Sequence, residues 1–242
     1  MKKDKENVWA IVPAAGIGAR MSADRPKQYI DVAGKTILEY TLNGLLSCHF
    51  IDAIQLCVSS SDEYWQHIKN SKEMQSDRLL PTVEGGETRA DSVLAGLEAL
   101  SDIANDHDWV MVHDAARPCI TQVLLTRMYD LLASTDVGGI LAVPVADTLK
   151  KANQQSDVID VENTIDRNQL WAAQTPQMFR FGLLKSSLAS ALENHLEITD
   201  EASALEKAGF TPKIVPSVRS NIKVTYPEDV DLVKFYLQQL AD

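Results

Sequence analysis

Small and cationic residues near the start of the chain could hold a phosphate group, in the stretch VWAIVPAAGIGARMSADRPKQYI. Its first six residues, at 8–13, are apolar and predict a buried strand. Gly16 and Gly18 follow that strand directly, and small residues there let backbone N–H groups approach an anion. Arg20 and Lys27 place two positive charges just beyond the glycines. The pattern indicates a phosphate or triphosphate site at the carboxyl end of a strand.

Nucleotidyl transfer is the chemistry that these two cations suit best. A dinucleotide-binding fingerprint would need a third glycine where Met21 stands, and a P-loop would need a Gly-Lys-Ser/Thr ending. Attack on the α-phosphorus of a nucleotide shifts negative charge onto phosphate oxygens, so fixed cations help where that charge grows. Arg20 can grip these oxygens with its planar fork, and Lys27 supplies a compact charge. The alternative is that both cations are solvated surface residues.

Asp114 is the candidate for contact with a second substrate. It follows the apolar run DWVMVH, which predicts a strand whose carboxyl end lies beside the first loop. A carboxylate in this place can orient a substrate hydroxyl or coordinate Mg²⁺, and its alternative is to cap the next turn. The neighbouring His113 is interpreted as a structural residue.

Two further segments combine turn residues with the start of a helix. In GGETRADSV, Gly86 lies in a turn and Ser92 inside the predicted helix, where its hydroxyl can bond to the backbone. In TDEASALE, Thr199 and Asp200 have the residue types of a helix N-cap. The residues by themselves favour these structural roles over contact with a ligand.

Strand-like and helix-like segments alternate along the chain and must position these residues. This alternation predicts an α/β fold, Rossmann-like, with a mostly parallel sheet and helices on both faces. Runs rich in Val and Ile indicate strands at 8–13, 52–59, 108–113 and 138–145, and weaker runs indicate strands at 79–84 and 212–216. Segments with helical spacing lie between them, at 37–46, 92–100 and 122–132.

One region departs from this alternation of strands and helices. Residues 147–179 have a polar, turn-like centre, NQQSD, flanked by segments of rough apolar and polar alternation. This pattern predicts a β-arm that projects from the sheet, and a long irregular loop is the alternative. Near the carboxyl end, Thr225 and Glu228 have capping-box spacing and Pro227 lies in the first turn of a predicted helix.

Composition and charge argue against several classes of protein. The 242 residues fit a single domain, and their net charge of −11 argues against a general nucleic-acid binder, although a local cluster of cations can still hold an anion. No apolar run approaches the length of a membrane span, and the lysine-containing start lacks a signal-peptide core, so a cytoplasmic protein is expected. The three cysteines and five histidines show no metal-binding spacing.

Nine motifs, in order from about residue 8 to the last helix, together resemble one family. They are PAAGIGARM, PKQY, GGETRADSV, VHDAARP, DTLK, TIDRNQLW, QTPQMF, TDEASALE and NIKVTYPED. The set resembles the 2-C-methyl-D-erythritol 4-phosphate cytidylyltransferase family of non-mevalonate isoprenoid biosynthesis. The resemblance implies one nucleotidyltransferase domain over 1–242 that converts CTP and methylerythritol phosphate, with Mg²⁺, into the CDP-alcohol and pyrophosphate. It does not identify a protein ligand for the metal.

The resemblance also implies roles for the nucleotide-binding and catalytic residues. Arg20 and Lys27 would stabilise the pentacoordinate transition state, while Arg25 receives no role. Glu87 would reach the ribose. The remaining nucleotide-binding positions, of which the last two would recognise cytosine, are Pro13, Ala14, Ala15, Gly16, Gly18, Gly86 and Ser92.

On the acceptor side, the resemblance implies that Asp114 contacts the methylerythritol hydroxyls. Arg167 and Lys223 would neutralise the acceptor phosphate, with Thr148 donating a hydrogen bond and Thr199 completing the site. In the family, the arm at about 147–172 crosses to a twofold partner, which implies a homodimer with composite sites.

Two alternatives remain open after the sequence has been considered. A related cytidylyltransferase would use ribitol phosphate or a sugar phosphate as acceptor, because activation of the triphosphate is chemically the same. A non-catalytic nucleotide-binding or scaffold protein could retain the fold. The absence of an evident general base is compatible with transfer to a phosphate oxygen that is already largely ionised.

Overall fold

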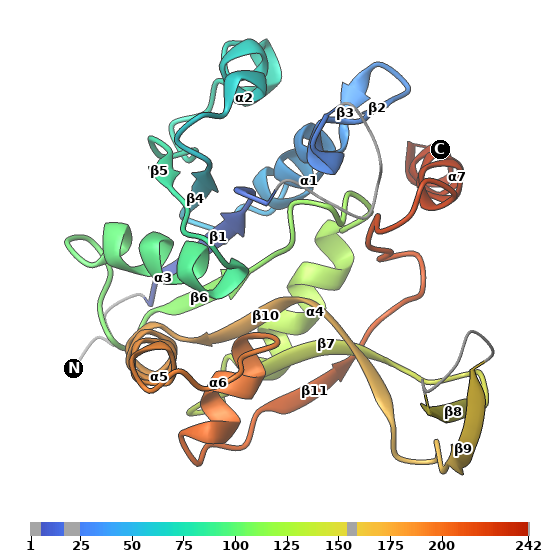
Figure 1. Cartoon of the computed structure of the whole chain (residues 1–242). Coiled ribbons are helices and arrows are strands. Elements are labelled where there is room, and N and C mark those ends of the chain that lie inside the picture. Colours follow the sequence, from blue (N-terminus) through green and yellow to red (C-terminus); the bar gives the residue numbers. More distant parts are fainter. Residues whose placement is uncertain (1–5, 17–24, 154–158, 242) are drawn as a thin grey trace.

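The computed structural model describes residues 6–16, 25–153 and 159–241, and within them seven strands form one central sheet. Their order is β11-β7-β10-β6-β1-β4-β5 (Figure 1). The strands are β1 (Val8–Pro13), β4 (Ala53–Val58), β5 (Val83–Glu84), β6 (Trp109–Val112), β7 (Gly138–Pro144), β10 (Trp171–Arg180) and β11 (Lys213–Pro216). All neighbouring pairs are parallel except the two that β10 makes with β6 and β7.

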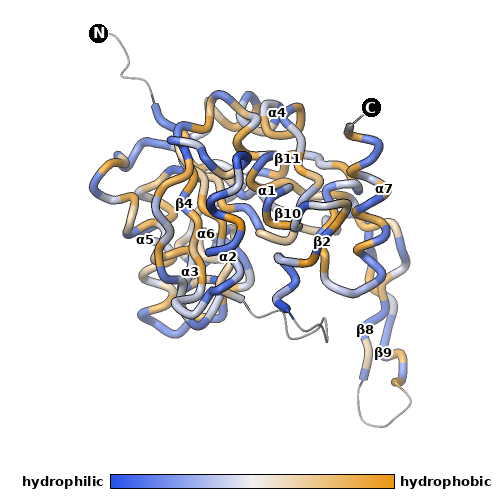
Figure 2. The backbone as a smooth tube through the Cα atoms, turned by 90° about the horizontal axis from the view of Figure 1, so that it is seen from above, coloured by the Kyte–Doolittle hydropathy of each residue, from blue (hydrophilic) through white to orange (hydrophobic). Residues whose placement is uncertain are grey.

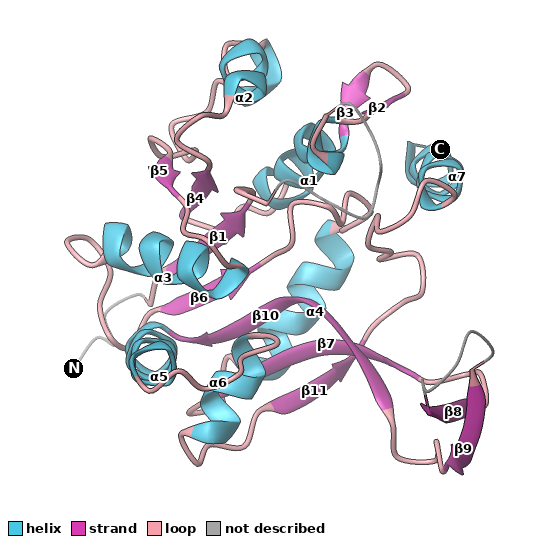
Figure 3. Cartoon of the chain, viewed as in Figure 1, coloured by secondary structure: helices cyan, strands magenta, loops and turns pink. Residues whose placement is uncertain are grey.

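Helices cover both faces of the sheet (Figures 1 and 3). Both faces need cover because successive strand residues point to opposite faces and are apolar on each. In β1, Val8, Ala10 and Val12 join one apolar cluster, and Trp9 and Ile11 join the other. The first cluster includes residues of α1 (Ile37–Leu46) and α4 (Gln122–Leu132). The second includes residues of α3 (Arg89–Leu100), α5 (Phe181–Glu193) and α6 (Glu201–Lys207). The predicted α/β fold with two covered faces is therefore confirmed.

The carboxyl-terminal helix α7 (Asp229–Ala241) packs over a third, smaller apolar cluster. This cluster joins α7 to the short hairpin of β2 (Asp31–Val32) and β3 (Lys35–Thr36). The remaining short elements are α2 (Glu63–Ile68) and the 3₁₀ turns η2 (Lys27–Tyr29) and η3 (Lys72–Met74). No helix within the described ranges has the length and apolar character needed to cross a bilayer.

A two-stranded arm stands away from the sheet, as Figure 2 shows from above. It consists of β8 (Leu149–Asn153) paired antiparallel with β9 (Asp160–Ile165). The predicted arm is thus present, but the segment 171–179 does not belong to it. These residues turn back into the sheet as β10, because their side chains from Gln174 to Phe179 are buried between β6 and β7.

Two other expectations were wrong in detail. The weak run at 79–84 contributes only its last two residues to a strand, β5. The last helix begins at Asp229, so Thr225 and Glu228 do not form its capping box. The Asp229 carboxylate instead accepts hydrogen bonds from the backbone N–H groups of Thr225 and Tyr226, at 2.7 and 2.8 Å. An aspartate satisfies the free N–H groups before a helix as well as a threonine does.

Candidate active site

A cavity of about 360 Å³ opens where loops from several strands meet. The loops after β1, β5 and β6 line it, together with η2 and the segment before α7. Carboxyl ends of parallel strands lie at one edge of a sheet, so residues distant in sequence converge there. The lining residues are Pro13, Ala14, Ala15, Gly16, Lys27, Gln28, Gly86, Glu87, Thr88, Arg89, Ser92, Asp114, Ala115, Ala116, Lys223 and Thr225.

The turn η2 joins the first loop to the far wall of the cavity. The Gln28 side chain, which is buried, donates to the carbonyls of Ala14 and Gly16, at 2.7 and 3.1 Å. Next to it, Lys27 Nζ donates to the carbonyl of Val224, at 3.0 Å. These contacts hold the Lys27 ammonium at the cavity and fix the shape of the loop beside it. Fixed geometry is what charge stabilisation during a reaction requires.

The second glycine loop packs tightly against the first. A Cβ atom on Gly85 would lie 2.6 Å from the Cβ of Ala15 and 2.8 Å from Ser92 Oγ. A Cβ on Gly86 would lie 2.3 Å from that of Asp91, whereas one on Gly16 would meet nothing within 4 Å. Gly85 therefore permits a close approach of the two loops, Gly86 permits a close approach of its own loop to the first turn of α3, and Gly16 faces open space.

Ser92 lies in the first turns of α3, beneath the second loop. Its hydroxyl donates to the carbonyl of Thr88 at 3.0 Å, and the side chain is buried. Thr88 itself caps α3 in a capping box with Asp91. The expected structural bond of Ser92 to the helix backbone is therefore present, and the residue also lines the cavity.

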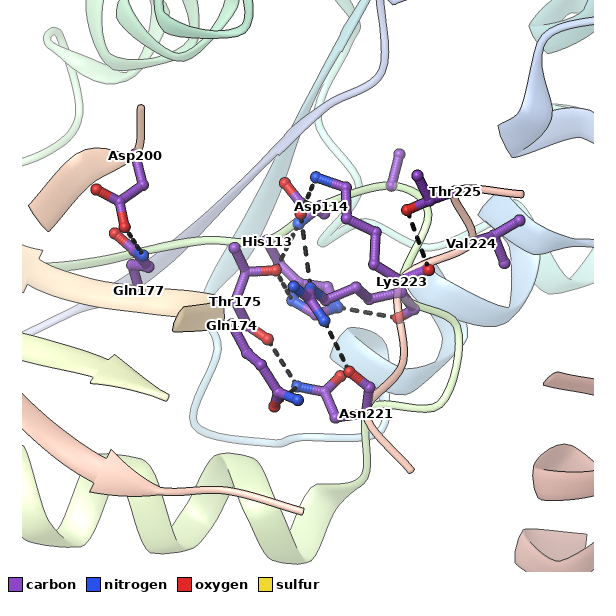
Figure 4. Close-up of polar contacts among 12 residues, drawn as sticks. His113, Asp114, Gln174, Thr175, Gln177, Asp200, Asn221, Lys223, Val224 and Thr225 are labelled. Carbon is purple, nitrogen blue, oxygen red and sulfur yellow. Dashed lines mark hydrogen bonds and ion pairs between the residues drawn. The ribbon is translucent and has the colours of Figure 1, made fainter. Parts of the chain in front are cut away.

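Three cations surround the Asp114 carboxylate, which is almost fully buried. Figure 4 shows one of them, Lys223, beside Asp114. Arg89 Nε lies 2.9 Å from Oδ1, while Lys223 Nζ and Arg117 Nε lie 2.8 and 3.5 Å from Oδ2. Burial acts to raise the pKa of Asp114, but Arg89, Lys223 and Arg117 together hold it well below its usual range. Asp114 is therefore an ionised, immobilised acceptor at the cavity wall.

Arg89 connects this carboxylate to a second buried one. Its two terminal nitrogens bond Glu201 of α6, Nη1 to Oε1 at 2.6 Å and Nη2 to Oε2 at 3.1 Å. Burial acts to lower the pKa of Arg89, but Glu201 and Asp114 raise it above its ordinary value. The guanidinium thus stays charged between two carboxylates.

His113 supports Asp114 from behind and does not line the cavity. Its Nε2 lies 3.1 Å from the carbonyl of Arg117, and because a carbonyl can only accept, Nε2 carries the proton. Nδ1 then accepts from the hydroxyl of Thr175 at 3.1 Å, and that hydroxyl oxygen accepts from the backbone N–H of Asp114 at 2.9 Å. Burial lowers the pKa of His113 to about 4, so the imidazole is neutral. The interpretation as a structural histidine agrees with this geometry.

Buried amides complete the scaffold around the Asp114 loop (Figure 4). Asn221 donates from its side chain to the carbonyl of Thr175 at 2.8 Å and accepts from Arg117 Nη1 at its own carbonyl, also at 2.8 Å. Gln177 of β10 donates to the Asp200 carboxylate at 2.8 Å and accepts from the backbone N–H of Ala202 at 2.9 Å. The strand β10 therefore fixes both the Asp114 loop and the start of α6.

The predicted site residues fall into four groups. Pro13, Ala14, Ala15, Gly16, Lys27, Gly86, Glu87, Ser92, Asp114 and Lys223 all line the cavity. Thr199 lines a smaller adjoining cavity of about 300 Å³, which shares Thr88 and Arg89 with the first. Thr148 and Arg167 lie at the base of the arm, one before β8 and one after β9. Gly18 and Arg20 lie outside the described residues.

Several residues of the site were not predicted from the sequence. Arg89 follows the glycine turn of GGETRADSV, so a search for cations near glycine turns could have found it. Arg117 lies three residues after Asp114 in VHDAARP, so a search for cations near that strand-end carboxylate could have found it. Thr175 and Glu201 could not be found in this way, because their partners are 61 and 112 residues away in the chain.

A protein-built metal site does not fit the described residues. Within them, no group of three or more His, Cys, Asp or Glu side chains is placed to hold a metal ion. Both oxygens of Asp114 already face cations.

Comparisons with known proteins agree along the whole chain. The family model for IspD, 2-C-methyl-D-erythritol 4-phosphate cytidylyltransferase, matches residues 8–239. The protein of that name from Photobacterium profundum is 48% identical over 236 residues, 97% of this chain and 98% of the relative. That from Vibrio vulnificus is 46% identical over 242 residues, 100% and 99% of the two chains.

Solved structures show the same likeness. One described as 4-diphosphocytidyl-2C-methyl-D-erythritol synthase aligns with a TM-score of 0.81 and 36% identity, covering 96% of this chain and 100% of its own. The 2-C-methyl-D-erythritol 4-phosphate cytidylyltransferase of Francisella tularensis aligns with a TM-score of 0.80 and 36% identity, covering 95% and 99%. The likeness thus extends over nearly the whole chain.

Proposed function

The chain belongs to the 2-C-methyl-D-erythritol 4-phosphate cytidylyltransferase family, and we propose that its reaction takes place in the cavity lined by Lys27, Asp114 and Lys223. The protein transfers CMP from CTP to 2-C-methyl-D-erythritol 4-phosphate, giving the CDP-alcohol and pyrophosphate in isoprenoid biosynthesis. The observation that supports this location is the meeting of a glycine loop, fixed cations and an ionised carboxylate in one cavity.

The donor nucleotide would occupy the side of the cavity formed by the two glycine loops. The open space at Gly16 leaves room for phosphates beside the backbone of the loop. The close contact of Gly85 with Ala15 makes a narrow wall, which suits the flat edge of a pyrimidine and leaves less room for a purine. Gly86 and Ser92 would contact the cytosine there, and Glu87 would reach the ribose.

The acceptor would lie against Asp114. An ionised carboxylate accepts hydrogen bonds from hydroxyl groups, and the methylerythritol chain carries hydroxyls. Lys223 Nζ, 2.8 Å from Asp114, would then bind the phosphate that carries the attacking oxygen. Thr199, which lines the adjoining cavity, would complete this side.

The transfer itself needs charge stabilisation more than proton transfer. The acceptor phosphate oxygen is largely ionised at neutral pH and attacks the α-phosphorus without a general base. The bond between the α-phosphorus and the bridging oxygen breaks, and pyrophosphate leaves with that electron pair. Lys27, together with Arg20, would stabilise the negative charge that grows on the phosphate oxygens.

Mg²⁺ is part of the proposal as a cation that arrives with the triphosphate. It would neutralise charge on the phosphate oxygens, and it prefers such oxygens and water as ligands. The described residues offer it no carboxylate cage, so its protein contacts remain unassigned.

A homodimer with composite sites is proposed for the arm. Thr148 and Arg167 lie at its base and do not line the cavity of their own subunit. The arm region also exposes large apolar side chains, among them those of Leu149, Val161 and Trp171, whose burial would favour association. Arg167 would then neutralise the acceptor phosphate in the partner's cavity.

A cytoplasmic location is proposed together with this function. Cys48, Cys57 and Cys119 are all buried and unpaired, which is typical of proteins in a reducing compartment. CTP, the donor, is likewise a cytoplasmic nucleotide.

The test is release of pyrophosphate from CTP by the purified full-length protein with Mg²⁺, in side-by-side reactions with methylerythritol phosphate, ribitol phosphate and sugar phosphates. Methylerythritol phosphate is expected to give the highest kcat/KM. A higher value with another acceptor would support the related cytidylyltransferase instead. CTP binding without turnover on any acceptor would point to a non-catalytic protein.

A further inference from the structure

Glu201 is a buried carboxylate to which the reaction described above gives no role. Its side chain is 2% exposed, and it lines the smaller cavity beside the proposed site. Both of its oxygens are bonded by Arg89, at 2.6 and 3.1 Å. Desolvating a carboxylate is costly unless it is paired, so a buried pair beside a substrate cavity calls for a functional explanation.

Arg89 transmits the position of Glu201 to Asp114. Because a guanidinium is planar and rigid, fixing both terminal nitrogens on Glu201 also fixes the direction of Nε. Nε lies 2.9 Å from Asp114 Oδ1. We propose that Glu201 is a positioning residue which, through Arg89, holds Asp114 in the orientation that receives the acceptor hydroxyls.

The ion pair between Arg89 and Asp114 leaves Lys223 available to the acceptor phosphate. Asp114 Oδ2 holds Lys223 Nζ at 2.8 Å, whereas Oδ1 is neutralised by Arg89. When the phosphate attracts Lys223, Asp114 keeps the Arg89 charge and is not left as an unpaired buried anion. This inference rests on the proposed function of the cavity and extends it to acceptor binding.

Two substitutions in the full-length enzyme test the inference. Glu201→Gln keeps the shape but removes the charge and one acceptor oxygen, and Arg89→Lys keeps the charge but cannot bridge two carboxylates with a rigid fork. Each is expected to raise KM for methylerythritol phosphate about 10- to 100-fold, the loss typical of a hydrogen bond to a charged group. KM for CTP is expected to stay within about twofold, because the contacts from Glu201 through Arg89 end at Asp114, on the acceptor side.

The double variant sharpens the test. If Glu201 acts through Arg89, the double variant should raise the acceptor KM no more than either single substitution. If the fold-changes in acceptor KM of the two single variants multiply in the double variant, the two residues act separately and Glu201 does not act through Arg89. The proposal would also be contradicted by an unchanged acceptor KM in either folded single variant, or by an equal rise in KM for the acceptor and for CTP.

A matched control uses another arginine–carboxylate pair. Arg180 Nη1 lies 2.9 Å from Glu6 Oε2, away from the cavity, and Glu6→Gln should leave both KM values unchanged. Circular dichroism and calorimetric CTP binding establish that each variant is folded. If Glu201→Gln does not fold, the KM values of Arg89→Lys for the acceptor and for CTP, compared with those of the wild type, decide whether the proposal holds. An inactive wild-type enzyme that still binds CTP would instead contradict the proposed function.

Discussion

At the scale of single residues, the balance of positive and negative side chains explains how the cavity can attract phosphates. The charged cluster at Asp114 comprises two buried carboxylates, those of Asp114 and Glu201, and the cations Arg89, Arg117 and Lys223. This cluster has an excess of one positive charge, to which Lys27 adds another at the same cavity. A local excess of cations can attract phosphates into a protein whose net charge is −11.

Removing Lys27 tests the role of a fixed cation in the transfer step. Lys27→Ala is expected to lower kcat for pyrophosphate release by about 100-fold or more, because charge that develops in the transition state loses its partner. KM for CTP should change much less. The loss of the Lys27 bond to the Val224 carbonyl should cost about 1 kcal/mol of stability.

Lys35 provides the control for this substitution. It forms an exposed ion pair with Glu73 at 3.5 Å, and Lys35→Ala should leave kcat unaltered. A Lys27→Ala enzyme with wild-type kcat would show that this lysine does not stabilise the transition state.

The buried histidine predicts how stability depends on pH. Burial lowers the pKa of His113 from 6.5 to about 4, so between these values the unfolded chain binds a proton that the folded chain does not. The free energy of unfolding should therefore fall with decreasing pH across this window, by at most about 1.4 kcal/mol per pH unit. Melting temperatures of the wild type and of His113→Gln, measured from pH 7 to about 4, should show a shallower dependence in the variant.

The pH windows of the two buried groups separate their effects. The pKa of Asp114 is lowered, so its stabilisation is lost as pH falls below its ordinary value of 3.8, outside the histidine window. His67 is exposed on α2, and His67→Gln should keep the wild-type profile. Parallel profiles for His113→Gln and the wild type would refute the assignment.

At the scale of elements, the site depends on the spacing between loops that follow different strands. The loop after β1 and the loop after β5 touch through Ala15 and Gly85. The strands β1 and β4 pair in parallel, and β4 pairs with β5, so the sheet sets the distance between the two loops. A single added methyl group at this contact changes the width of the proposed nucleotide site.

Gly85→Ala tests this contact. Its Cβ would lie 2.6 Å from that of Ala15, so the loops must separate. KM for CTP is expected to rise about 10-fold or more, with a stability loss of about 1–3 kcal/mol from overpacking. KM for the acceptor should change less, because Asp114 lies on another loop.

A second substitution shows whether the contact itself is responsible. Adding Ala15→Gly removes the opposing Cβ and should recover part of the CTP affinity and of the melting temperature. If the double variant binds CTP no better than Gly85→Ala alone, the steric explanation fails.

At the scale of the whole molecule, the arm and the cavity are separate parts of the chain. The arm stands away from the sheet (Figures 1 and 2), and Thr148 and Arg167 do not line their own cavity. In the proposed homodimer, twofold symmetry would give each cavity the arm of the other subunit.

Mixed dimers test that arrangement. Lys27→Ala disables a cavity and Arg167→Ala disables an arm, so each variant alone should be nearly inactive. Random mixing by co-expression makes half of the dimers mixed, and each mixed dimer has one intact cavity with an intact arm, so about a quarter of the wild-type activity should return. No recovery, with mixed dimers present in native mass spectrometry, would contradict composite sites.

Local patterns determined much of the fold and part of the site. The short apolar run at 8–13 matches β1. The segments at 37–46 and 122–132 match α1 and α4, because their apolar residues recur at helical spacing and can be buried on one face of a helix. Glycine loops at strand ends likewise identified much of the cavity wall, since ligand loops follow the carboxyl ends of parallel strands.

Contacts between distant residues were decided by the tertiary structure. Periodicity cannot show that 171–180 pairs with β6 and β7 and so leaves the arm, because pairing depends on partners elsewhere in the chain. For the same reason, the bonds of Glu201 through Arg89 to Asp114 leave no mark on local sequence. Residue types set what each side chain can do, and packing sets which of them meet.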